Sequence, residues 1–102
     1  MINISGVPYE YAEDIGDDAN GETLYVHQKG SPGITCTLVA GSNTGKFEFS
    51  TSSKAKLIAG TAIWQAWAKG TSTGTVSDVL LGPVTGLRGV SVSGAVSIEV
   101  VV

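Results

Sequence analysis

The sequence predicts an all-β protein, a single-domain antiparallel β-sandwich of about seven strands with an extended N-terminal arm. At 102 residues the chain is long enough for one hydrophobic core and too short for a second domain of ordinary size. Its 14 glycines, 21 serines and threonines and many valines are typical of short strands joined by tight turns. Strand-like segments also recur at regular intervals after Gly21, as the strands of a sandwich do.

The first 22 residues differ in composition from the rest of the chain, and we expect them to form an acidic arm or long loop. They hold six of the nine acidic residues and neither Lys nor Arg, with a weak strand signal at Ile2–Ser5 and a strand-breaking Pro8. We expect this arm to reach neighbouring subunits of an assembly. Its acids are Glu10, Glu13, Asp14, Asp17, Asp18 and Glu22.

The sandwich domain is expected to span residues 23–102, with Gly, Ser, Asn and Pro clusters between its strands. The segment from Ser52 to Trp67 is ambiguous, because one helical turn fits Ser53–Ala59 before Gly60 ends it; we interpret it as a loop or short turn followed by a strand. The expected strands are Glu22–Lys29, Gly33–Ala40, Lys46–Ser50, Thr61–Lys69, Thr75–Leu81, Val84–Val92 and Ala95–Val102.

The last two strands are expected to form a hairpin around a two-residue turn at Ser93-Gly94. That register pairs Val92 with Ala95, Val90 with Ser97 and Arg88 with Glu99. The alternate positions then form a buried apolar face, made of Leu87, Val96, Ile98, Val100 and Val102.

Charge and hydropathy exclude several classes of function. The net charge is −3, and the six Lys and Arg residues form no basic stripe, so we expect no nucleic-acid partner. No apolar run reaches the length of a membrane helix, and the N-terminus lacks the pattern of a signal peptide. Charged residues make up only 15% of the chain against roughly 25% in ordinary soluble domains, which indicates surface buried in an assembly.

Two polar segments are similar to ligand-binding motifs. Ala40–Lys46 begins like a phosphate-binding loop, but Phe47 stands where a metal-binding Ser or Thr is required and a strand follows in place of a helix. We therefore interpret it as a hairpin turn. The acidic run Asp14–Glu22 has oxygens suited to calcium, but its spacing does not match the helix-loop-helix signature, so we expect a solvated loop with calcium as the alternative.

No set of residues forms a recognisable catalytic group, and we expect no enzymatic activity and no cofactor. Cys36, the one cysteine, lies on the apolar side of an alternating strand, which favours a buried side chain over a reactive thiol. His27 also lies within a strand, where we expect a structural or surface role. Three acids fall in the strand region, and nothing in the sequence selects a pair of them for glycoside cleavage: Glu48, Asp78 and Glu99.

Trp64 and Trp67 are the most informative large side chains. On a strand they point to opposite faces, one into the core and one outward. An outward Trp can stack on a sugar ring or bind a protein partner; the alternative is that its own loop covers it. The candidate contacts with a partner or glycan are Trp64, Trp67, Glu13, Asp14, Asp17 and Asp18.

Residues 45–102 contain four blocks that are informative together: a G-K-x-x-x-S-T-S block from Gly45, a W-x-x-W pair from Trp64, a P-V-T-x-L-R strand from Pro83 and the segment Ser93–Val100. In these blocks the chain resembles small virion proteins of tailed bacteriophages. Gly86 stands where the third block is expected to have Ala, a departure that loosens that strand. The blocks are specific as a set and weak singly.

The resemblance implies a virion structural protein, and we expect a capsid decoration (cement) protein that binds and stabilises the assembled head. Its expected partners are the major capsid protein and neighbouring copies of itself, as a homo-oligomer on the outer surface of the head. The chain is expected to be made in the bacterial host cytoplasm. Two alternatives stay open: a glycan-binding accessory module on the virion surface, and a tail or neck structural subunit.

Overall fold

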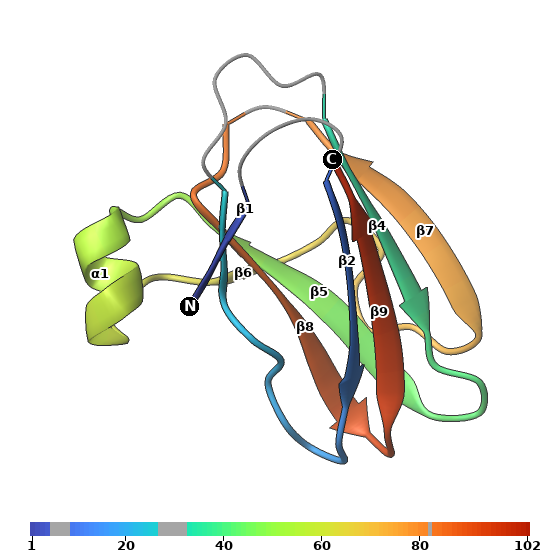
Figure 1. Ribbon diagram of the computed structural model, residues 1–102. Coiled ribbons are helices and arrows are strands. Elements are labelled where there is room, and N and C mark those ends of the chain that lie inside the picture. The colour runs from blue at the N-terminus through green and yellow to red at the C-terminus, as the bar shows by residue number, and fades with distance from the viewer. Residues whose placement is uncertain (5–8, 27–32, 82) are drawn as a thin grey trace.

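The computed structural model describes residues 1–4, 9–26, 33–81 and 83–102. Within these ranges the chain forms nine strands and one short helix, and the strands make two packed sheets of five and four strands (Figure 1). The predicted all-β, sandwich-like class is therefore confirmed. The strands are more numerous than predicted; most are shorter, whereas the strand expected over Lys46–Ser50 begins two residues earlier, at Thr44.

The four-stranded sheet is antiparallel throughout. Along its strand from 34 to 39, Ile34, Cys36 and Leu38 are buried while Thr35 and Val39 are exposed. This alternation directs one side of the sheet to the core and the other to solvent. In spatial order its strands are β2 (Glu10–Ile15), β9 (Val96–Val101), β4 (Ile34–Val39) and β7 (Thr75–Leu80).

The five-stranded sheet contains one parallel pair, β1 with β3, and is otherwise antiparallel. Its longest pairing joins β5 to β8 over residues 44–50, with an irregularity between Thr44 and Gly45. In spatial order the strands are β1 (Ile2–Ile4), β3 (Leu24–Val26), β8 (Gly86–Ser93), β5 (Thr44–Ser50) and β6 (Gln65–Ala66).

The core lies between the two sheets and draws on both. Phe47 is fully buried, and its ring centroid lies 4.9 Å from that of Trp67. Gly89, opposite Phe47 in register, brings the sheets close together, because a Cβ atom there would lie 2.8 Å from side-chain atoms of Ile15 and Ile98. The buried apolar residues of this cluster are Ile4, Ile15, Leu24, Val26, Ile34, Cys36, Leu38, Ala40, Phe47, Trp67, Leu87, Val96, Ile98 and Val100.

The prediction of an extended N-terminal arm is wrong. Strand β2 pairs with β9 along its whole length, and β1, the weak strand signal of the sequence, pairs with β3. Ile4 and Ile15 are only 0% and 3% exposed, so the segment contributes to the core. The acids of β2 obscured the strand because they occupy outward or half-buried positions, while Ile15 alone on that strand is buried.

The predicted hairpin at Ser93-Gly94 is wrong in its pairing and right in its faces. Strands β8 and β9 belong to different sheets, so the turn carries the chain across the core instead of joining neighbours. Arg88 lies opposite Glu48, and Glu99 lies opposite Ala12 and Thr37. Alternating apolar residues around a tight turn are compatible with strands that pair and with strands that face each other. The expected buried face is confirmed, with Leu87, Val96, Ile98 and Val100 buried and Val102 packed against the core.

The turns that follow β2, β4 and β8 all cross between the sheets and are bonded to one another at one end of the molecule (Figure 1). The Asp17 carboxylate accepts a hydrogen bond from the Gly94 N–H at 2.6 Å, and Asn43 Nδ2 donates to the Ala95 carbonyl at 2.8 Å. The buried Ser91 hydroxyl donates to the Gly94 carbonyl. The segment after β4 is thus a turn as predicted, but it joins two sheets and is not a hairpin.

The ambiguous segment forms helix α1 (Lys54–Ala59), where we expected a loop or short turn. The Ser53 hydroxyl caps its start by accepting a hydrogen bond from the Lys56 N–H at 3.3 Å. Gly60 ends the helix with φ at 76°, a left-handed conformation that glycine adopts without steric cost. The strand expected over Thr61–Lys69 shortens to β6.

Candidate functional site

The outward side of the four-stranded sheet is a regular surface whose twelve side chains are all exposed or half-buried. We call it the open face. Because the four strands pair in register, these side chains stand in three rows across the sheet. The rows are Glu10, Val101, Thr35 and Val79; Ala12, Glu99, Thr37 and Ser77; and Asp14, Ser97, Val39 and Thr75.

The polar groups of the open face are partly engaged with one another. The hydroxyls of Thr37 and Ser77 are 2.9 Å apart across β4 and β7, and the Ser97 hydroxyl donates to the Asp14 carboxylate at 2.7 Å. Both contacts join side chains that are direct neighbours in register. Such cross-strand pairs hold the side chains in defined positions, so the face presents an ordered surface.

The apolar and charged groups of the open face give it a distinct chemistry. Val39, Val79 and Val101 are 41%, 47% and 47% exposed, which is high for valine. The three charged residues among the twelve are all acidic: Glu10, Asp14 and Glu99. The face therefore combines small apolar groups and hydroxyls with a negative charge.

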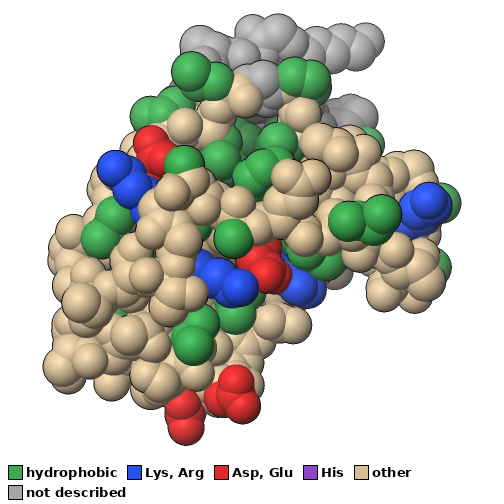
Figure 2. All heavy atoms as spheres, turned by 180° about the vertical axis from the view of Figure 1, so that it is seen from behind, with side chains coloured by type: hydrophobic (Ala, Val, Ile, Leu, Met, Phe, Trp, Pro, Cys, Tyr) green, Lys and Arg blue, Asp and Glu red, His purple; other side chains and the backbone are tan. Residues whose placement is uncertain are grey.

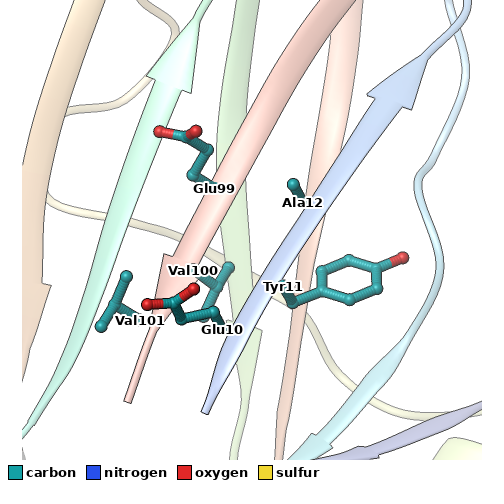
Figure 3. A pocket seen from close by; sticks show the side chains of 6 residues that line it. All are labelled: Glu10, Tyr11, Ala12, Glu99, Val100 and Val101. Carbon is teal, nitrogen blue, oxygen red and sulfur yellow. The ribbon is translucent and has the colours of Figure 1, made fainter. Parts of the chain in front are cut away.

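An open depression lies between β2 and β9, at one side of the open face (Figure 3). Ala12 and Glu99 are direct partners in register, as are Glu10 and Val101. The single methyl group of Ala12 leaves room that a longer side chain would fill. The two carboxylates are diagonal neighbours, a relation that separates Cβ atoms by about 7 Å in antiparallel sheets. In Figure 3 the Tyr11 ring projects away from Glu99 and Val101.

The outward side of the five-stranded sheet is different, because α1 and the chain that follows it cover part of it. A Cβ atom at Gly86 would lie 2.8 Å from Leu57 and 3.2 Å from Trp64. Beside this contact, Glu48 accepts hydrogen bonds from Arg88 at 2.7 and 2.9 Å and lies 3.3 Å from the Lys46 ammonium. Figure 2, seen from behind, shows an acidic side chain between basic ones near the centre of the visible face.

Trp64 and Trp67 flank β6 and point to opposite sides, as predicted. Trp67 is 2% exposed, and its Nε1 donates to the Gly70 carbonyl at 2.7 Å, so it is a core residue. Trp64 is half-buried, and the Arg88 guanidinium lies 4.1 Å from its ring centroid. One face of the Trp64 ring is therefore occupied by the chain itself.

The four acids proposed as contacts do not gather at one place. Asp14 belongs to the open face, Asp17 caps the turn after β8, and Asp18 is exposed in a left-handed conformation with φ at 49°. The Glu13 carboxylate accepts hydrogen bonds from the Glu22 N–H at 3.0 and 3.1 Å. Over the described ranges, no three acidic, His or Cys side chains are close enough to hold a metal ion.

Glu13 also accepts a hydrogen bond from the Tyr11 hydroxyl at 3.1 Å. Partial burial and the nearby Glu13 carboxylate raise the pKa of Tyr11 to about 12. Through its hydrogen bonds with Tyr11 and Glu22, the Glu13 carboxylate joins β2 to the segment that follows it.

The remaining candidates are separated by the fold. Cys36 is fully buried, and burial with the nearby Asp78 carboxylate raises the pKa of its thiol to about 12. Glu48 lies in the five-stranded sheet, whereas Asp78 and Glu99 occupy opposite sides of the four-stranded one. His27 lies outside the described residues.

Sequence reasoning missed the open face because it missed β2. The segment Glu10–Ile15 does carry a period-two signal, in which Tyr11, Glu13 and Ile15 are more buried than their neighbours. Recognising the alternation of Tyr11 with Ile15 would have found the strand. Its partner and its register depend on contacts with residues 96–101, more than 80 positions away.

Comparison with known proteins gives no match: no family model fits the chain, and no curated protein or solved structure is significantly similar to it. In the described part of the chain, no helix has both the length and the apolar character needed to cross a bilayer.

Proposed function

We propose that this chain is a non-enzymatic structural protein of a tailed-bacteriophage virion, and specifically a capsid decoration protein that binds the assembled head and stabilises it. Two lines of argument support this proposal. The first is the resemblance of residues 45–102 to small virion proteins. The second, which carries it, is the open face: an ordered, solvent-facing sheet surface suited to contact with another large surface.

The chemistry of the open face supports binding to a protein surface. Its twelve side chains offer methyl, hydroxyl and carboxylate groups, with no imidazole, thiol or amine among them. Small side chains on a sheet lose little conformational entropy when a partner covers them. Exposed valines supply apolar area, and the hydroxyls of Ser and Thr supply hydrogen-bonding groups.

The proposed mechanism is stabilisation by mass action. A protein that binds the assembled shell and not its free subunits favours assembly by RT ln(1 + [L]/Kd), or about 2.7 kcal/mol per site at a hundred times Kd. The proposed partners are the major capsid protein and neighbouring copies of this chain on the outside of the head. Neither nucleic acid nor membrane takes part in this mechanism.

The glycan-binding alternative depends on a Trp ring that a sugar can reach. Trp67 is buried, and Arg88 covers one face of Trp64, so the fold supports this alternative less well. Binding of the chain to a polysaccharide array, lost in Trp64→Ala, would overturn the decoration proposal in its favour.

The decoration proposal is tested by adding the purified chain to phage heads that lack it and following rupture by calorimetry. We expect the rupture temperature to rise with concentration until sites are filled. Thr37→Arg, at the centre of the open face, is expected to abolish the rise, whereas Thr51→Arg, exposed elsewhere, leaves it unchanged. An unchanged rupture temperature with the unmodified chain refutes the proposal, and cryo-electron microscopy that locates the chain on the tail or neck favours that alternative.

A further inference from the structure

We propose that the open face binds a basic protein surface, and that a Lys or Arg side chain of the partner enters the depression between β2 and β9. The inference rests on the proposed function for the identity of the partner, a shell protein. The chemistry of the contact is argued from the face itself.

The charge of the open face determines the kind of partner. Glu10, Asp14 and Glu99 bring three negative charges, and no cation stands among the twelve side chains. The Ser97 hydroxyl donates to Asp14, whereas the carboxylates of Glu10 and Glu99 have no hydrogen-bond or ion-pair partner among residues 1–4, 9–26, 33–81 and 83–102. A partner that covers this face must offset these charges, because burying carboxylates without a counter-charge is costly.

The depression has the shape and chemistry for one long cationic side chain. Ala12 leaves the space, Val101 offers methyl groups, and the carboxylates of Glu10 and Glu99 flank it diagonally (Figure 3). Lys and Arg bury an alkyl stem on apolar groups while the charged end stays among polar ones. The stem would contact Val101 and Ala12, and the cation would lie between the two carboxylates.

A second copy of this chain fits the open face poorly. Four strands spaced by about 4.8 Å, each with six residues at about 3.3 Å, make a face of roughly 400 Å². A stable interface buries about 800 Å² on each partner, so this face alone is too small for a stable complex with a single copy of any protein. Two copies face to face would also bring six carboxylates together. Contacts between neighbouring copies on a particle would therefore use other surfaces.

The small area implies weak binding by one copy. Because the contact is between charged groups, the binding also depends strongly on salt. An exposed ion pair contributes about 0.2–1 kcal/mol, so losing one carboxylate weakens binding of a cationic side chain about 1.4- to fivefold. High occupancy on a particle would then come from many copies or from a second contact.

The test is a nuclear magnetic resonance titration of the ¹⁵N-labelled chain with the tripeptide acetyl-Gly-Arg-Gly-amide. The matched control peptide has citrulline in place of Arg, which keeps the shape and removes the charge. We expect the Arg peptide to shift amide signals in β2 and β9 around Ala12 and Val101, and the citrulline peptide to shift them at least severalfold less. Equal shifts with both peptides, or shifts scattered over the molecule, overturn the inference.

Protein variants localise the effect. Glu10→Gln and Glu99→Gln are each expected to weaken binding of the Arg peptide about 1.4- to fivefold, while Glu22→Gln, which removes an exposed carboxylate outside the open face, leaves it unchanged. Equal weakening by all three overturns the inference. Open-face shifts that grow with protein concentration in the absence of peptide would identify a second copy as the occupant and also overturn it. The peptide titration uses no particle, so a negative titration does not contradict binding to the shell. A negative calorimetric test of shell binding likewise does not contradict a positive titration.

Discussion

Val100 and Val101 are neighbours on β9 that face opposite sides of the four-stranded sheet, so replacing each with Ala tests which side is the core. Val100 is 0% exposed and lies between Tyr11 and Cys36 in register. Val101 is 47% exposed on the open face. The two substitutions remove the same atoms and the same β-propensity, so their difference reports burial alone.

The expected costs differ severalfold. Removing two fully buried methyl groups costs about 1.6 kcal/mol in transfer free energy at about 0.8 kcal/mol each. A residual cavity of about 40 Å³ adds about 1 kcal/mol, which gives about 2.5 kcal/mol for Val100→Ala. The Val101 side chain is half exposed, so Val101→Ala loses few buried contacts and should cost about 0.5 kcal/mol or less. For a domain of this size, 2.5 kcal/mol lowers the melting temperature by about 10–20 °C.

Urea denaturation followed by tryptophan fluorescence measures both values, because Trp67 is buried in the folded state. If both variants have the same slope of free energy against urea as the unmodified chain, neither changes the unfolded state. If Val101→Ala costs as much as Val100→Ala, the open face is covered in solution or the two sides are reversed. Either result refutes the face assignment and the docking surface built on it.

Three further predictions concern the packing of the sheets. Glu48→Gln should cost about 1 kcal/mol at pH 7. Partial burial alone would raise the pKa of Glu48. The Arg88 guanidinium and the Lys46 ammonium outweigh this effect and hold the pKa of Glu48 below its ordinary value. The stabilisation is therefore present above the unfolded-state pKa of about 4.3 and lost as pH falls through the lower folded-state pKa, so the variant's urea midpoint should change less between pH 5 and 3. Gly89→Ala should cost about 1–3 kcal/mol by overpacking, while Gly16→Ala, where a Cβ meets nothing within 4 Å, should be near neutral; equal thermal midpoints would contradict the close approach of the sheets. Deleting residues 1–22 should abolish cooperative unfolding, because it removes β1 and β2, and a retained β-type circular dichroism spectrum with a sharp melt would restore the arm.

Local sequence patterns were sufficient for the class and for most strand positions. Alternation in Ile34–Val39 and Val96–Val101 identified strands and their buried sides, since the period-two geometry of a strand depends only on the strand itself. The same logic assigned Trp67 or Trp64 to the core and the other outward. Ser53 and Gly60 likewise marked the ends of a helical turn, although propensity alone did not favour the helix over a loop.

Local sequence patterns did not predict which strands pair with one another. The turns at Ser93-Gly94 and after β4 read as hairpins, because a tight turn between apolar strands occurs both within a sheet and between two sheets. Only the packed core decides between them, since Gly89 and Gly45 let the sheets approach where larger residues would not fit. The Arg88 side chain consequently met Glu48 instead of Glu99.

The sequence by itself determined that this chain is a small β protein with a known set of inward-facing residues, because burial of alternate side chains is a local property. The tertiary structure decided that the acidic N-terminal segment is a strand and that Glu10, Ala12, Glu99 and Val101 share one surface. Those residues are brought together by pairing of β2 with β9 across most of the chain length. The free energy of that pairing comes from the core that both strands cover, and the core exists only when the two sheets are packed.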